Sequence, residues 1–128
     1  MDDVDTWVEQ ASTRLAQQVE SAQQHAAAAA KLAHDMERVK GEARSQRADI
    51  KVTTDVSGRV TDIEVTDAAA PYYGAYLSQM LLQTINEARA DAARQAKDLA
   101  RAAFGEDSPT YARITADLND AQKKRTHQ

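Results

Sequence analysis

One β-hairpin pattern, set between two long helical patterns, constrains the fold of this chain most. In residues 50–65, IKVTTDVSGRVTDIEV, polar and more apolar residues alternate with a period of two, as in half-buried antiparallel strands. Asp55-Val56-Ser57-Gly58 predicts a type I turn, with Asp at its first position and Gly at its last. An isolated hairpin is marginally stable in water. Other elements, or a second copy of the chain, must therefore complete the sheet.

Residues 4–39, before the hairpin, carry the seven-residue repeat of a coiled coil. Its two rows alternate at spacings of three and four: Val8, Leu15, Ala22, Ala29 and Met36, and Val4, Ala11, Gln18, His25, Leu32 and Val39. The small and polar residues at the centre predict a long helix that is weakly specified there. We expect Gly41 to end this helix at the C′ position. The polar segment 42–48 is either a third strand or a loop.

A second long helix is predicted from about residue 75 to residue 104, ended by Gly105. Its expected buried stripe is Leu77, Leu81, Ile85, Ala88, Ala92, Leu99 and Ala103. Ser108 as N-cap and Pro109 as first residue predict a short amphipathic helix to about Ala121, followed by a frayed tail. The expected fold is α+β in a single domain over 1–128, with a core of about 5–104 and a helical extension and tail over 105–128.

Two narrow helical stripes and a small sheet cannot cover each other fully in one copy. Alanine inflates the 42% apolar content, and the chain has one Trp and one Phe. Free strand edges also need protection. We therefore expect a homodimer, whereas a monomer with its helices folded over the sheet is the alternative. The candidate interface residues are Val8, Leu15, Leu32, Met36, Ile50, Val52, Ile63, Leu81 and Ile85.

Three stretches in this order resemble the YbaB/EbfC family of nucleoid-associated DNA-binding proteins. They are the Gln/Ala-rich first helix, DIKVTTDVSGRVTDIEVTD, and LSQMLLQTINEARADAARQAK with Asn86, Ala88 and Ala92. The resemblance covers about residues 5–104 and is that of a divergent member, like the additional paralogues of actinobacteria. SQRAD replaces the family's Gly-rich segment, and the capped segment 108–121 replaces its flexible tail. The resemblance implies a tweezer-shaped dimer with the sheet at its hinge.

The sequence gives no support for an enzyme, a cofactor or a metal. It lacks the signatures of a P-loop, a dinucleotide site, a zinc protease or a serine hydrolase, and it has no cysteine. His25 lies on the heptad seam, where packing is a more common role than metal binding. No apolar run approaches the ~20 residues that span a bilayer. We therefore expect a cytoplasmic protein without catalytic residues, bound metal or membrane partner.

Basic residues gather in two places although the net charge is −4. One candidate DNA-binding set lies around the hairpin, and a second lies on one face of the second helix: Arg38, Lys40, Arg44, Arg47, Lys51 and Arg59, and Arg94, Lys97 and Arg101. Acidic neighbours leave a second interpretation open, a solvated surface with local ion pairs. No aromatic residue is interleaved, so we expect contacts with duplex phosphates and low sequence specificity.

Tyr72, Tyr73 and Tyr76 anchor a loop on a core or interface, or contact a protein partner. Two functions follow. The first is a nucleoid-associated homodimer that binds duplex DNA. The second, favoured by the acidic total charge, is a DNA-independent interaction module of the same fold, for example an accessory to a secretion or cell-envelope system.

Overall fold

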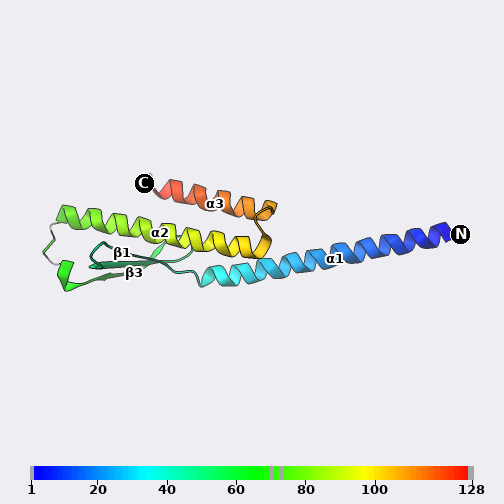
Figure 1. The fold of residues 1–128 in the computed structure, drawn as a ribbon, viewed down its shortest axis with the longest axis horizontal. Helices are drawn as coiled ribbons and strands as arrows, with labels where there is room; N and C mark the ends of the chain where they lie inside the picture. Colours follow the sequence, from blue (N-terminus) through cyan, green and yellow to red (C-terminus); the bar gives the residue numbers. More distant parts are fainter. Residues whose placement is uncertain (1, 70, 73, 127–128) are drawn as a thin grey trace.

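The computed structural model describes residues 2–69, 71–72 and 74–126. It confirms an α+β fold, with three long helices and a small antiparallel sheet (Figure 1). A 3₁₀ turn, η1, connects the sheet to the second helix. The elements are α1 (Asp2–Glu37), β1 (Gly41–Arg44), β2 (Ile50–Thr54), β3 (Val60–Val65), η1 (Asp67–Ala69), α2 (Gly74–Phe104) and α3 (Pro109–Thr126).

The sheet contains the predicted hairpin and one more strand, in the order β1-β2-β3. The sequence allowed either a third strand or a loop in the polar segment after α1. The structure contains both, because residues 41–44 form β1 and residues 45–49 form a loop. The turn between β2 and β3 forms as expected. The Asp55 carboxylate accepts hydrogen bonds from the backbone N–H groups of Ser57 and Arg59, at 3.0 and 2.9 Å. Gly58 supplies the left-handed residue, with φ of 86°.

Helix α2 covers one face of the sheet along β1 and β2. Ile50, Val52 and Ala88 form the centre of the core and are fully buried. On α2 a small residue is buried at every fourth position: Thr84, Ala88, Ala92, Ala96 and Ala100. The sequence pattern found Ala88 and Ala92 but missed the other three, while the larger predicted residues Leu77, Leu81, Ile85 and Leu99 are half-buried. Close approach of α2 to β1 explains the buried Ala88 and Ala92, because only short side chains fit beside Gly41.

Gly41 does not end α1, so this prediction is wrong. The helix ends at Glu37, and Gly41 is the first, buried residue of β1. A Cβ atom there would overlap the carbonyl oxygen of Ala88 and lie 2.7 Å from the Cβ of Ala92. Glycine is therefore needed for the contact between β1 and α2 and not for a helix cap.

The two halves of α1 have different environments. Its C-terminal half packs on α2: Leu32 is buried, as is Val39 just after the helix, and the rings of His25 and Phe104 lie 4.9 Å apart. His25 is therefore a packing residue. The N-terminal half extends past the end of α2 without touching the rest of the chain (Figure 1). We call residues 3–22 the arm.

Helix α3 turns back and runs alongside α2 (Figure 1). Gly105, with φ of 82°, ends α2, and the Ser108 hydroxyl accepts a hydrogen bond from the N–H of Thr110 at 3.1 Å. Both match the predicted stop and N-cap. The helix is longer than expected, however, because it continues to Thr126 through the segment predicted to fray.

Strand β3 lies at the edge of the sheet and is mostly exposed. Ile63 and Val65 pair with Val52 and Ile50, so they share the face that α2 covers on the other strands. Their exposed fractions are nevertheless 44% and 52%. Of the candidate interface residues, Ile50 and Val52 have no exposed surface to offer a second copy, because they fill the core of the chain. Ile63 is exposed, and Leu81 and Ile85 of α2 are half-buried.

Candidate nucleic-acid interface

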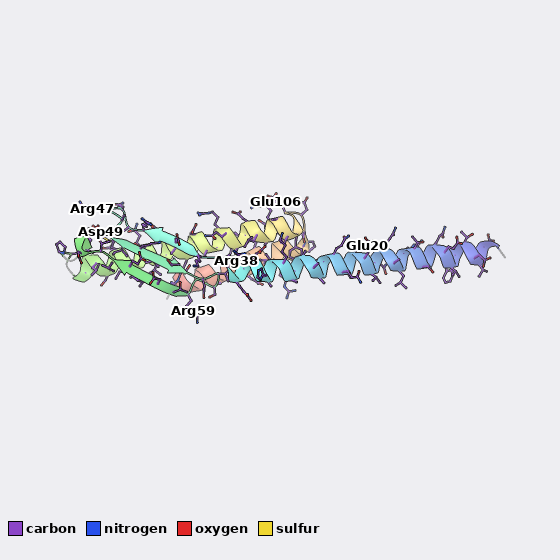
Figure 2. The ribbon with its side chains drawn as sticks, turned by 90° about the horizontal axis from the view of Figure 1, so that it is seen from below. Glu20, Arg38, Arg47, Asp49, Arg59 and Glu106 are labelled. Atoms are coloured by element: carbon purple, nitrogen blue, oxygen red, sulfur yellow. The ribbon has the colours of Figure 1, made fainter. Side chains whose placement is uncertain are left out.

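The basic residues around the hairpin form two patches and not one. Arg44 on β1 pairs directly with Lys51 on β2, and Arg47 follows in the adjoining loop. We call these three residues the loop-end patch. Arg38, Lys40 and Arg59 lie by the opposite end of the strands, and we call them the turn-end patch. Figure 2 shows Arg47 at the far end of the sheet, and Arg38 and Arg59 nearer to α1.

Acidic side chains lie between and beside the two patches. Glu42, Thr53 and Asp62 form one row across the three strands, on the same face of the sheet as Arg44 and Lys51. Glu64 is the β3 neighbour of Lys51. The sequence grouped the cations by their position along the chain and could not show this row, because it depends on the strand register.

Most cations of the two patches have no carboxylate partner. Arg59 lies 3.5 Å from Asp55, an exposed pair that contributes little to stability. Within the part of the chain that the structure describes, no ion pair involves Arg38, Lys40, Arg44, Arg47 or Lys51. All except the half-buried Lys51 are exposed. These groups are therefore available to an anion.

The loop-end patch borders a groove of about 370 Å³ between the loop after β1 and the first half of α2. Arg44 at the end of β1 and Arg47 in the loop line one side of it, and Gln79 and Gln83 line it from α2 with Tyr76. The groove therefore combines guanidinium and amide donors, the groups that hold phosphate oxygens, with the carboxylate of Glu87, which accepts a hydrogen bond from Gln83 at 3.4 Å. Sequence analysis missed both glutamines, although their spacing of four residues places them on one face of a helix.

The second candidate set, on α2, is already occupied by contacts within the chain. Arg94 pairs with Asp91, and Lys97 donates a hydrogen bond to the side-chain oxygen of Asn119 at 2.7 Å. Arg101 lies 3.1 Å from Asp98 and 2.9 Å from Glu106, and it contacts Tyr111 of α3. The hydrogen bond to the Tyr111 hydroxyl raises the pKa of Arg101. These contacts match the local ion pairs that the acidic neighbours indicated.

Two of the three clustered tyrosines can be placed, and Tyr73 lies outside the described residues. The Tyr72 hydroxyl donates a short hydrogen bond to the buried carboxylate of Asp49, which raises the pKa of Tyr72. The rings of Tyr72 and Tyr76 meet edge to face at 5.3 Å. Tyr72 thus anchors the connection after β3 on the loop after β1, whereas Tyr76 stays exposed beside the groove.

Other kinds of site find little support in the described part of the chain. No group of three or more His, Asp or Glu side chains there could hold a metal ion. No helix among these residues has the length and apolar character needed to cross a membrane.

The family model of the YbaB/EbfC DNA-binding family matches residues 11–107. The chain belongs to the YbaB/EbfC DNA-binding family. The match includes the sheet, both basic patches and α2. It leaves α3 and the first ten residues of the chain outside. A search of curated proteins finds no match to the sequence.

Proposed function

We propose that this YbaB/EbfC protein is a nucleoid-associated homodimer that binds duplex DNA through its phosphates. The observation that carries the proposal is the set of exposed cations without carboxylate partners at both ends of the sheet, inside the region that matches a DNA-binding family. The corresponding location is the nucleoid, in the cytoplasm. We assign no catalytic role, cofactor or metal.

The arrangement of the patches favours contact with the DNA backbone. Residues 50 and 54 mark the two ends of β2, so the patches lie roughly 13 Å apart at ~3.3 Å per residue. The acidic row between them repels phosphate, so each patch is expected to hold its own phosphate. The cations of α2 are held by partners within the chain, so we expect no reading of bases by a helix in the major groove. Binding should therefore depend strongly on salt and weakly on sequence.

A second copy would complete the sheet at β3. Ile63 and Val65 continue the apolar face of the core but extend beyond the cover of α2. Leu82 and Ile85 lie on the same side of α2 as Arg89, whose Nε donates a hydrogen bond to the Gly58 carbonyl at the turn before β3. We expect these residues to form one apolar border along the open strand edge. Pairing of two such borders would protect both edges and double the number of basic patches.

The test is a titration with random-sequence duplex DNA at several salt concentrations, using Arg44→Gln/Arg47→Gln. Each lost phosphate contact should lower the slope of log affinity against log salt by about one unit. Affinity should fall about equally for all sequences. The melting temperature should change little, because both side chains are exposed. Light scattering should give at least twice the 14.0 kDa chain mass.

The matched control is Arg94→Gln/Arg113→Gln, which removes the same charge outside the sheet. It should leave the salt slope unchanged. Equal weakening by both double variants would show that only total charge matters and would contradict the proposed site. The acidic row and the net charge of −4 favour the second candidate function, an interaction module that does not bind DNA. Absence of binding by the wild-type protein at low salt would decide for that function.

A further inference from the structure

The arm of α1 carries a stripe of large apolar side chains that nothing covers. Val4, Trp7, Val8, Leu15 and Val19 have exposed fractions between 49% and 67%. They recur at helical spacing, so all five lie on one side of the arm. A stripe of this kind on a soluble helix is normally buried against another helix. In proteins most of the stability of a helix comes from packing of its amphipathic face against other elements.

The order of residues in the stripe is nearly the same in both directions. Val4 and Val8 are four residues apart, and so are Leu15 and Val19. Small residues, Ala11 and Ser12, stand midway between the two pairs. If two arms run antiparallel about this midpoint, Val4 of one lies at the level of Val19 of the other, and Val8 at the level of Leu15. A two-fold interface requires this kind of reciprocal match.

The free length of the arm fits such a pair. With the midpoint between residues 11 and 12, the first residues of one arm reach the level of residues 21–22 of the other. The body of the molecule begins three residues later, where His25 contacts Phe104. Two arms can thus overlap along their whole free length, about 30 Å at 1.5 Å per residue, before either one meets the other body.

The charges favour the antiparallel direction. Asp3, Asp5 and Glu9 make the tip of the arm acidic, and Arg14 is the cation of the arm. Parallel arms would bring two acidic tips together. Antiparallel arms keep the tips apart and place each one beside the half of the other arm that carries Arg14 and only one acidic residue, Glu20. Trp7 and Arg14 are seven residues apart, so both lie along the same edge of the stripe. In an antiparallel pair, this edge of one arm lies next to the same edge of the other arm. Trp7 would therefore lie near Arg14 of the second copy, within reach of a cation–π contact.

We propose that the arm binds the arm of a second copy of this chain, antiparallel and centred between Ala11 and Ser12. The two bodies then lie at opposite ends of the paired arms, roughly 40 Å apart at 1.5 Å per residue between the two His25 positions. This contact is separate from the sheet edge at β3. A chain with both surfaces assembles beyond a dimer, and, on the proposed function, its basic patches can hold two duplexes at once.

Disulfide trapping tests the direction and register, because the chain contains no cysteine. Val8→Cys and Leu15→Cys would be prepared separately, one with a tag that changes its size, and then mixed and oxidised. Antiparallel pairing predicts a mixed crosslink in at least five-fold excess over either self-crosslink. The control pair, Gln10→Cys and Gln17→Cys on the opposite side of the helix, should give no excess. Efficient self-crosslinking of each variant without the mixed product would indicate parallel arms and overturn the proposal.

A second measurement tests whether the stripe holds the copies together. Leu15→Asp should lower the mass found by light scattering at least two-fold at tens of micromolar protein, without loss of helix signal from the body. An unchanged mass would overturn the proposal. In a DNA pull-down, the wild-type protein should join a bead-bound duplex to a free labelled duplex. The Leu15→Asp protein should bind single duplexes normally, but most of the labelled duplex should no longer be recovered with the beads. If crosslinking succeeds and no duplex binds, the arm contact stands and the proposed function fails.

Discussion

Replacing Gly41 with alanine should destabilise the protein far more than a single methyl group suggests. The added Cβ would overlap the carbonyl oxygen of Ala88 and lie 2.6 Å from the Thr54 hydroxyl oxygen and 2.7 Å from the Cβ of Ala92. The first neighbour is backbone inside a helix, so it cannot rotate away. Relief requires β1 to move away from α2, and this opens the interface between the sheet and its only covering helix among the described residues.

The expected cost is about 3 kcal/mol, the upper end for an overpacked core. For a chain of this size, that corresponds to a fall in melting temperature of roughly 10 °C. The backbone contributes nothing to this cost, because the φ of Gly41 is not in the left-handed region. The whole effect is steric, so Gly41→Ser should behave similarly.

Urea unfolding followed by circular dichroism at 222 nm would measure the change, with all variants at one protein concentration because association affects stability. Gly74→Ala is the matched control. Its added Cβ meets no atom within 4 Å, and its position at the start of α2 suits alanine. It should be neutral or stabilise by up to about 1 kcal/mol. A Gly41→Ala protein within 0.5 kcal/mol of wild type would refute the reasoning, since the strand and helix could then separate without cost.

Two further predictions concern the hairpin turn and the small-residue line on α2. Hydrogen bonding, foremost from the Ser57 hydroxyl, lowers the pKa of Asp55, so the carboxylate stabilises the fold above its unfolded pKa of about 3.9 and this contribution is lost as the pH falls below that value. Between pH 6 and pH 3 the free energy of unfolding of wild type, measured in urea, should therefore fall more than that of Asp55→Asn, by about 1 kcal/mol or less. Parallel curves would count against the turn geometry. Ala96→Leu should cost about 1–3 kcal/mol because Ala96 is fully buried, whereas Ala90→Leu on the exposed side should be nearly neutral. Circular dichroism melts would compare the two, and equal stability would mean that α2 does not pack as closely as described.

Much of the fold was predictable from patterns within a few residues. The hairpin, its Asp55–Gly58 turn, the stop of α2 at Gly105 and the start of α3 at Ser108 all appear where the sequence indicated them. Each depends on local chemistry: a period of two, a side chain that caps a nearby N–H, or a glycine that accepts positive φ. The α2 stripe was less well predicted, because hydrophobicity favours leucine while close packing selected alanine.

The candidate site was predictable in composition but not in arrangement. The sequence identified six cations around the hairpin, and the structure divides them into two patches with Glu42 and Asp62 between them. It also identified the ion pairs of Arg94 and Arg101, because their partners lie within one helical turn. Gln79 and Gln83 were not predicted as part of the site. A polar residue on an exposed helix face is common, and only the tertiary structure shows that a loop lies opposite these two.

The sequence by itself determined the local conformation of nearly every segment, because helix period, strand alternation and turn chemistry involve neighbours only a few residues apart. Tertiary structure decided which surfaces these segments use. It assigned Gly41 to a contact with Ala88, 47 positions away, and divided the heptad seam into a half that packs on α2 and an arm that stays bare. The seam residues Leu15 and Leu32 look equivalent in the repeat, yet one is exposed and the other buried. The difference arises because α2 has a fixed length, and only the part of α1 that lies beside it can be covered.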